Sequence, residues 1–312
     1  MNPSPPCVVC LGEVLWDLLP SGPQLGGAPA NLACHVAQLG GTAILLSRVG
    51  RDDRGRKARA GLRDRGVRLE LLQEDPILPT GTVSVELDDS GHPRFTIVEH
   101  VAWDHLEATP DTLDAVRGAM AVCFGTLAQR SPVSRQTIGE LLQASPPGAL
   151  RLCDINLRDP FHTPEVIESS LRAANALKLN ETELPVLGRI FGFPGEPRAA
   201  VEALATRFNL GSVLLTLGAA GSRVWSDGRW VAESGRNVAV RDTVGAGDSF
   251  TAAFVLARLL HWPMADALKS ATEIAAYVCT QSGATPELPP ELKEPFHRLT
   301  SERQPKSALE TA

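Results

Sequence analysis

Residues 242–248 read Asp242-Thr243-Val244-Gly245-Ala246-Gly247-Asp248 and run directly into the segment Ser249 to Leu260. Apolar residues recur in that segment at the spacing of one helix face, which predicts an α-helix with Asp248 in its first turn. Small residues at 245–247 allow a ligand to approach the backbone, and the unpaired N–H groups of a helix start favour an anion. The sequence therefore predicts an anion hole with a carboxylate at its edge.

That carboxylate has two interpretations. Beside a bound phosphoryl group, Asp248 would accept the proton of an attacking hydroxyl as a general base. The alternative is that Asp248 only caps the helix. Other parts of the chain favour the first interpretation.

Composition limits the kind of partner. The chain has 312 residues, of which 43% are hydrophobic and 21% charged, enough for one large globular domain. Its formal net charge is -6, and no Lys- or Arg-rich run is present, so we expect no nucleic-acid or membrane partner. No apolar run approaches the length of a transmembrane helix. A small-molecule partner is favoured.

Six cysteines are scattered mostly through apolar runs, which is typical of free thiols in a reducing compartment. Cys7 and Cys10 resemble a metal or redox pair. Residues three apart on a strand point to opposite faces, however, so we expect neither use. The sequence predicts a cytoplasmic protein.

The N-terminal part carries a second glycine-rich helix start. Alternation from Glu13 to Leu19 predicts a strand with Glu13 and Asp17 on one face. Gly26-Gly27-Ala28-Pro29-Ala30-Asn31 then opens a predicted helix that ends near Leu39. Asn31 falls in its first turn, where a side-chain amide reaches a ligand over the glycines.

Residues 80–98 predict an antiparallel hairpin, because Val83, Val85 and Leu87 alternate with polar residues before the turn at Asp88-Asp89-Ser90-Gly91. With the strand at 13–19, this hairpin would form a small sheet that covers a site as a lid. The alternative is an edge extension of the main sheet.

From about residue 110 strands and helices alternate, which predicts an α/β fold with a parallel sheet between helices. Ligands of such sheets gather at the carboxyl ends of the strands. The residues that directly follow four of the apolar runs are Gly125-Thr126, Asn156-Leu157-Arg158, Asn180-Glu181-Thr182-Glu183 and Gly218-Ala219-Ala220-Gly221.

These strand ends have both binding and structural interpretations. Arg158 would hold a polyol or carboxylate, or form a structural ion pair. Asn180 and Glu183 would hold a hydrated Mg²⁺, or form an ordinary helix cap. The turn that starts at Thr216 and is closed by Gly221 would let a nucleotide approach the backbone.

Several common site types are absent from the sequence. No two histidines have metal-ligand spacing, and the Gly-x-Ser-x-Gly nucleophile turn is missing. The phosphate loop ending in Gly-Lys-Ser or Gly-Lys-Thr and the Gly-x-Gly-x-x-Gly dinucleotide turn are missing as well. The two commonest nucleotide-binding folds are therefore disfavoured.

In these motifs the chain resembles the ribokinase-like (pfkB) carbohydrate kinase family. Residues 26–31 and 242–248 are similar to its two signatures, 180–183 to its Asn-x-x-Glu motif, and 216–218 to its nucleotide loop. The resemblance extends from about Val8 to about Pro290. It implies a three-layer α/β/α sandwich with a mostly parallel central sheet plus a small β-sheet lid. The kinase domain would span 1–299, with lid segments at about 13–25 and 80–105, followed by a mobile tail at 300–312.

The resemblance also implies the chemistry, which is transfer of the γ-phosphoryl group of ATP to a sugar hydroxyl with Mg²⁺. Asp248 would be the base, and the backbone of Gly245, Ala246 and Gly247 would hold the phosphoryl group. Asn180 and Glu183 would hold Mg²⁺ through water. Asp242 and the Val244 carbonyl, with the loop 279–283, match the region where many members bind K⁺. The residues implied for sugar binding are Asp17, Gly26, Gly27, Asn31, Phe95 and Arg158, and those for the nucleotide are Thr216, Gly218, Gly221, Gly245 and Gly247.

The segments 11–17, 102–104, 124–127 and 154–158 are most similar to the fructokinase branch, which implies phosphorylation of D-fructose to fructose 6-phosphate. Arg158 leaves 2-keto-3-deoxygluconate as an alternative, since it could bind that carboxylate. Other sugar or nucleoside substrates, such as ribose and adenosine, are further alternatives. Two other classes stay open: a sugar- or nucleotide-binding regulator, and a dinucleotide-dependent oxidoreductase. The exposed edges of the lid hairpin also suggest a homodimer through the lid.

Overall fold

The computed structural model describes residues 5–87, 93–193 and 195–302. A nine-stranded sheet forms its centre, in the order β13-β12-β11-β10-β9-β8-β1-β4-β5. Neighbouring strands from β11 through β5 pair in parallel, and β12 and β13 are antiparallel. The strands are β1 (Cys7–Leu11), β4 (Thr42–Gly50), β5 (Leu72–Asp75), β8 (Ala121–Gly125), β9 (Leu150–Asp154), β10 (Ala176–Asn180), β11 (Ser212–Thr216), β12 (Gly221–Ser226) and β13 (Arg229–Ser234).

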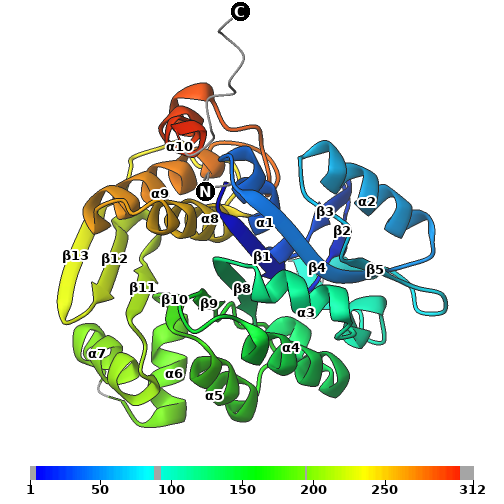
Figure 1. The fold of residues 1–312 in the computed structure, drawn as a ribbon, viewed down its shortest axis with the longest axis horizontal. Helices are drawn as coiled ribbons and strands as arrows, with labels where there is room; N and C mark the ends of the chain where they lie inside the picture. The colour runs from blue at the N-terminus through cyan, green and yellow to red at the C-terminus, as the bar shows by residue number, and fades with distance from the viewer. Residues whose placement is uncertain (1–4, 88–92, 194, 303–312) are drawn as a thin grey trace, which may run out of the picture.

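Helices cover both faces of this sheet (Figure 1). The helices that pack on one face are α1 (Ala28–Gln38), α2 (Asp53–Asp64), α8 (Ala246–Leu259), α9 (Met264–Cys279) and α10 (Pro290–Glu302). The helices on the other face are α3 (Pro110–Arg117), α4 (Pro132–Ala144), α5 (Pro164–Ala173), α6 (Glu183–Phe191) and α7 (Pro197–Phe208). The central strands are buried on both sides because successive side chains enter the two helical layers in turn. The predicted three-layer sandwich is confirmed.

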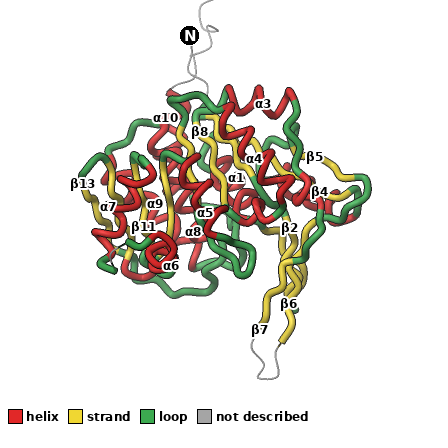
Figure 2. Tube along the Cα trace, turned by 90° about the horizontal axis from the view of Figure 1, so that it is seen from below, coloured by secondary structure: helices red, strands yellow, loops and turns green. Residues whose placement is uncertain are grey.

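A second sheet of four strands projects from this body (Figure 2). Its order is β3-β2-β6-β7, and its strands are β2 (Leu15–Leu19), β3 (Gly22–Gly26), β6 (Gly81–Leu87) and β7 (Pro93–Ile97). We call it the lid sheet. It is separate from the main sheet, so the edge-extension alternative is wrong. The turn at 88–91 lies outside the described residues.

Three features differ from the sequence prediction. Strand β2 begins at Leu15, so Glu13 lies in the connection after β1 and not in the strand. The strands β3, β5, β12 and β13 carry weak periodicity and were not predicted. Cys7 packs on one face of the main sheet and Cys10 on the other, as the strand period requires, and all six cysteines are free.

The C-terminal boundary is only partly described. Helix α10 extends to Glu302, and residues 303–312 lie outside the described part of the chain, so the mobile tail stays a prediction. Within the described ranges, no helix combines the length and apolarity needed to cross a membrane.

Candidate active site

The start of α8 is open toward the carboxyl ends of the parallel strands. Gly245 is its N-cap with φ of 79°, and no side chain caps the first turn. A Cβ on Gly245 would lie 2.2 Å from the carbonyl oxygen of Ala284, so glycine is required here both by conformation and by space. The first N–H groups of a helix have no intrahelical partner, and that of Ala246 makes a long bond of 3.3 Å to the Thr243 carbonyl, so this turn offers donors that suit an anion.

Asp248 lies in that first turn and meets the second glycine-rich helix start. Asn31, in the first turn of α1, donates a hydrogen bond of 2.8 Å from Nδ2 to Oδ2 of Asp248. Burial raises the pKa of Asp248 to about 6, against the lowering effect of the Asn31 hydrogen bond. The Asp248 side chain makes no N-cap hydrogen bond, and Asn31, which is 217 positions away in sequence, holds it instead. A carboxyl with this pKa is suited to accept a proton near neutral pH.

A buried ion pair lies behind the anion hole. Lys178 Nζ is 3.0 Å from Oδ2 of Asp154, and a Cβ on Gly247 would lie 2.9 Å from the same Nζ. The single hydroxyl hydrogen of Thr251 is shared between the Gly247 carbonyl, at 2.9 Å, and Asp154 Oδ2, at 3.3 Å. Although burial disfavours the charged amine, the carboxylates of Asp154 and Glu183 raise the pKa of Lys178. The first turn of α8 thus packs against a charged lysine side chain.

Two of the predicted sugar residues, Asp17 and Arg158, interact through their charges. Burial raises the pKa of Asp17, against the lowering effect of the Arg158 charge. The same charge lowers the pKa of Asp248, so these three residues form one charged group. A Cβ on Gly26 would lie 2.6 Å from Oδ2 of Asp17, and one on Gly27 would lie 2.5 Å from the Glu13 carbonyl.

Glu13 interacts with the same charged residues, Arg158 and Asp248, although it is not among the predicted site residues. Its side chain is buried, and burial raises its pKa to about 6, with the charge of Asp248 acting in the same direction. Glu13, Asp154 and Asp248 line a cavity of about 20 Å³, together with Thr126 and Asn156. This space accommodates about one water molecule between the carboxyl groups.

Asn180 and Glu183 form a reciprocal cap at the start of α6. Asn180 Oδ1 accepts from the backbone N–H of Glu183 at 2.9 Å, and Glu183 Oε2 accepts from the N–H of Asn180 at 2.8 Å. Glu183 Oε1 accepts from the N–H of Leu157 at 2.9 Å. Burial, followed by the charge of Asp154, raises the pKa of Glu183. The capping interpretation is therefore correct for the hydrogen bonds, and the remaining lone pairs of Glu183 still fit a water-bridged cation.

The predicted nucleotide turn lies beside this cap. Thr216 pairs with Asn180 across β10 and β11, and Gly218 has φ of 52°. The nearest atom to a Cβ on Gly218 would be Glu181 Oε1 at 3.5 Å, so this residue is open to a ligand. Gly221 differs, because its Cβ would lie 2.1 Å from the Glu233 carbonyl, which shows a packing reason for that glycine.

The loop before α8 is held by Asp242. Its Oδ1 accepts from the N–H of Val244 and its Oδ2 from the N–H of Gly283, each at 3.0 Å. The N–H of Asp242 bonds the Cys279 carbonyl at 3.2 Å. The region matched to a K⁺ site is therefore contiguous. Among the described residues, no group of three or more His, Cys, Asp or Glu side chains is arranged to hold a metal ion.

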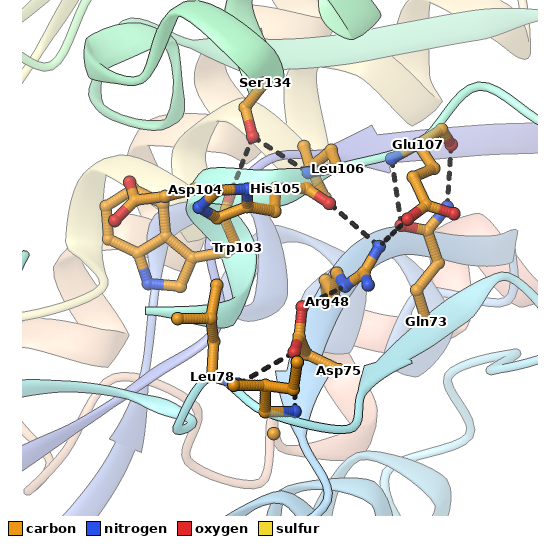
Figure 3. Close-up of polar contacts among 12 residues, drawn as sticks. Arg48, Gln73, Asp75, Leu78, Trp103, Asp104, His105, Leu106, Glu107 and Ser134 are labelled. Carbon is orange, nitrogen blue, oxygen red and sulfur yellow. Dashed lines mark hydrogen bonds and ion pairs between the residues drawn. The ribbon is translucent and has the colours of Figure 1, made fainter. Parts of the chain in front are cut away.

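A buried arginine anchors the connection that follows the lid sheet (Figure 3). Arg48 on β4 pairs with Asp75 through Nε at 2.9 Å, and its Nη1 donates to the His105 carbonyl at 2.9 Å and to Glu107. His105 ends the short helix η1 (Ala102–His105), which directly follows the lid strand β7 in sequence. Phe95 lies on β7 opposite Val85, and its side chain is outside the described part of the structure.

The site thus contains residues that motif reasoning missed. Lys178 and Glu13 are single charged residues next to apolar runs. A charged residue inside a buried strand, such as Lys178, or beside a glycine turn, such as Glu13, is the sequence feature that could indicate a role in the site. The partners that justify them, Asp154 and Asp248, are distant in sequence. Only the fold brings them together.

Comparison with known proteins gives a consistent result. The family model described as pfkB family carbohydrate kinase matches residues 23–291. A fructokinase from Vibrio alginolyticus is 31% identical over 297 residues, covering 89% of this chain and 94% of the relative. A fructokinase from Klebsiella pneumoniae is 31% identical over 296 residues, covering 89% and 95%.

Solved structures agree with this. An uncharacterized sugar kinase from Pyrococcus horikoshii superimposes with a TM-score of 0.78 at 26% identity, covering 95% of this chain and 98% of that one. Fructokinase from Vibrio cholerae O395, in a form with fructose, ADP and calcium ion, gives 0.77 at 25% identity, covering 93% and 98%. With its glycine-rich starts of α1 and α8 joined at Asp248, this chain belongs to the pfkB family of carbohydrate kinases.

Proposed function

We propose that this protein transfers the γ-phosphoryl group of ATP to O6 of D-fructose. The observation that carries the proposal is the contact between Asn31 and Asp248, which joins the glycine-rich start of α1, proposed to bind the sugar, to the uncapped start of α8, proposed to bind the phosphoryl group. Fructokinases are among the relatives that share 31% of its residues over most of both chains. Aminoimidazole riboside kinase and ribokinase are structural neighbours as well, so the family alone leaves the sugar open.

In this mechanism Asp248 removes the proton from O6 as the oxygen attacks the γ-phosphorus, and ADP leaves. The N–H groups of Gly245, Ala246 and Gly247 stabilise the negative charge of the transferring group. Asp17 accepts hydrogen bonds from sugar hydroxyls and Asn31 donates to them, while Gly26 and Gly27 allow the Asp17 side chain and the Glu13 backbone to pack closely beside the sugar. Lys178 adds a fixed positive charge beneath the hole.

Mg²⁺ and the nucleotide would occupy the neighbouring strand ends. Asn180 and Glu183 would hold Mg²⁺ through water, and when bound the ion neutralises charge on the phosphate oxygens. Thr216, Gly218 and Gly221 would border the nucleotide. Asp242 and the Val244 carbonyl would hold K⁺, which supports the loop that ends in Gly245.

The choice of a neutral sugar rests on charge, and the choice of fructose among neutral sugars rests on the fructokinase relatives. Asp17, Glu13 and Asp248 surround the site, and Arg158 is the cation whose charge acts on all three. A neutral polyol matches the hydroxyl-binding carboxylates, whereas a sugar phosphate would meet their repulsion. The second candidate, 2-keto-3-deoxygluconate, is favoured only by Arg158, because its carboxylate would pair with that guanidinium.

A coupled assay of ADP release tests the proposal with fructose, 2-keto-3-deoxygluconate, ribose and adenosine, each with and without Mg²⁺. We expect magnesium-dependent turnover that is fastest with fructose. The control without sugar measures ATP hydrolysis. No turnover above that control with any acceptor would refute the kinase activity, and a faster rate with 2-keto-3-deoxygluconate would replace the substrate.

Two further parts of the proposal concern the state of the protein. We place it in the cytoplasm, in agreement with its six free cysteines. We also propose a homodimer in which lid sheets of two chains pair, because β3 and β7 are edge strands of the lid sheet. A monomer mass by sedimentation at assay concentration would contradict the dimer.

A further inference from the structure

His35 is a buried histidine that the mechanism above does not use. It lies on α1, one turn after Asn31, and is 0% exposed. Its Nε2 is 2.9 Å from the carbonyl oxygen of Ala284. Because a carbonyl only accepts, Nε2 carries the proton in this contact. Burial lowers the pKa of His35 to about 4, so the ring is neutral near pH 7 and donates from Nε2 alone.

The partner of His35 is also the residue against which the anion hole packs. A Cβ on Gly245 would lie 2.2 Å from the Ala284 carbonyl oxygen and 2.6 Å from its Cα. The preceding residue, Gly283, donates its N–H to Asp242 at 3.0 Å. The backbone at 283–284 is therefore in direct contact with both ends of the loop 242–245, and a shift of Ala284 would be passed to Gly245.

Helix α1 also forms hydrogen bonds with the residues that follow Ala284, farther from Gly245. Gln38 Nε2 donates to the Pro286 carbonyl at 3.1 Å, and its Oε1 accepts from the N–H of Leu288 at 2.9 Å. One helix thus carries Asn31, which contacts Asp248, His35, which fixes Ala284, and Gln38, which fixes residues two to four positions beyond. Of these three residues, His35 is the one that contacts the segment where it packs against Gly245.

We propose that His35 is a positioning residue for phosphoryl transfer, which holds the Ala284 backbone and thereby the anion hole at Gly245 in register with the sugar-binding end of α1. This inference rests on the proposed kinase activity. Anion-hole donors are effective only when they are held in place before the charge develops. Loss of the hydrogen bond is therefore felt in the transition state more than in substrate binding.

Three substitutions at His35 separate the hydrogen bond from simple packing. His35→Leu fills the space without a donor. His35→Gln places an amide N–H at the reach of Nε2, and His35→Asn places one only at the reach of Nδ1. We expect kcat to fall about threefold to tenfold in His35→Leu and His35→Asn, with KM for fructose within about twofold of wild type. His35→Gln should restore kcat to within about twofold.

Gln38→Leu is the matched control, because it removes two hydrogen bonds to the same segment away from Gly245. We expect it to lower the melting temperature while leaving kcat unchanged. Equal kcat in wild type, His35→Leu and His35→Asn would overturn the proposal, as would an equal loss of kcat in Gln38→Leu. If His35→Leu does not fold, equal kcat in His35→Gln and His35→Asn overturns it.

The wild-type assay separates this proposal from the function on which it rests. Turnover of fructose by the wild type with unchanged kcat in the His35 variants refutes only the role of His35. A wild type that is inactive with every acceptor refutes the kinase activity and the role of His35 together.

Discussion

Helices α8 and α6 begin at the same edge of the main sheet, and their first turns are built differently. The start of α6 is satisfied locally, because the side chains of Asn180 and Glu183 each accept a hydrogen bond from the other residue's backbone N–H. The start of α8 has a glycine N-cap and no capping side chain, and its acidic residue bonds Asn31 on another helix. An uncapped first turn costs stability unless a ligand satisfies it. The contrast supports the proposal that the first turn of α8 binds the reacting anion, whereas the first turn of α6 is satisfied by its own side chains.

The strongest way to break this comparison is to change Asp248 to Asn. If Asp248 is the base, turnover should fall on the order of 10²- to 10⁴-fold while ATP binding is retained. Steady-state kinetics and nucleotide titration by calorimetry measure the two quantities. A variant with nearly full rate would reduce Asp248 to a structural residue.

The second test is Gly245→Ala. A side chain there must adopt φ of 79° and approach the Ala284 backbone, so we expect a loss of about 2 to 4 kcal/mol in the free energy of unfolding, together with loss of activity. Urea denaturation measures the stability.

Gly139→Ala is the control, because nothing lies within 4 Å of its Cβ and Gly139 is inside α4. It should stabilise the protein by about 0.5 to 1 kcal/mol. Equal free energies of unfolding for the two variants would show that position 245 accommodates a Cβ beside the Ala284 backbone.

Glu183→Gln sharpens the interpretation of α6. The amide loses the charge that attracts a hydrated cation, and it keeps only one of the two oxygens that accept from the backbone N–H groups of Asn180 and Leu157. We expect the Mg²⁺ concentration for half-maximal rate to rise about tenfold, together with a loss of about 1 to 3 kcal/mol in the free energy of unfolding.

Thr109→Ala supplies a comparison at α3, where Thr109 accepts from the N–H of Thr112 far along the chain from the site residues. It should cost about 1 kcal/mol of stability without changing the Mg²⁺ dependence. If Glu183→Gln shows the same pattern as Thr109→Ala, Glu183 is a cap alone.

The smallest expected effect concerns pH. Because the pKa of Asp248 is raised to about 6 and the base must be deprotonated, kcat/KM should fall as pH drops through about 6. Arg158→Gln removes a positive charge that lowers the pKa of Asp248, which should move this acidic limb to higher pH. Rate profiles between pH 4.5 and 8 measure the limb, on the order of tenfold per unit on its steep side. A limb that stays in place in Arg158→Gln would show that the guanidinium does not act on Asp248.

Much of the fold could be predicted because its signals are local. The helices that start at Ala28 and Ala246 follow glycine-rich turns and carry helix-period apolar residues, and the buried parallel strands are short apolar runs. Strand β13 lies at the edge of the main sheet and β12 lies beside it, and both were missed because partly exposed strands have mixed composition. Strand β3 was missed for the same reason, with Pro23 in its second position.

The sequence by itself determined the family, the order of the layers and the residues of both glycine-rich motifs, because each of these depends on spacing within one segment. Only the tertiary structure decided what those residues touch. It joined Asn31 to Asp248, put Lys178 beneath Gly247, and set His35 against the backbone that supports Gly245. The physical reason is that hydrogen bonds and burial act between segments up to 259 residues apart, which no local pattern records.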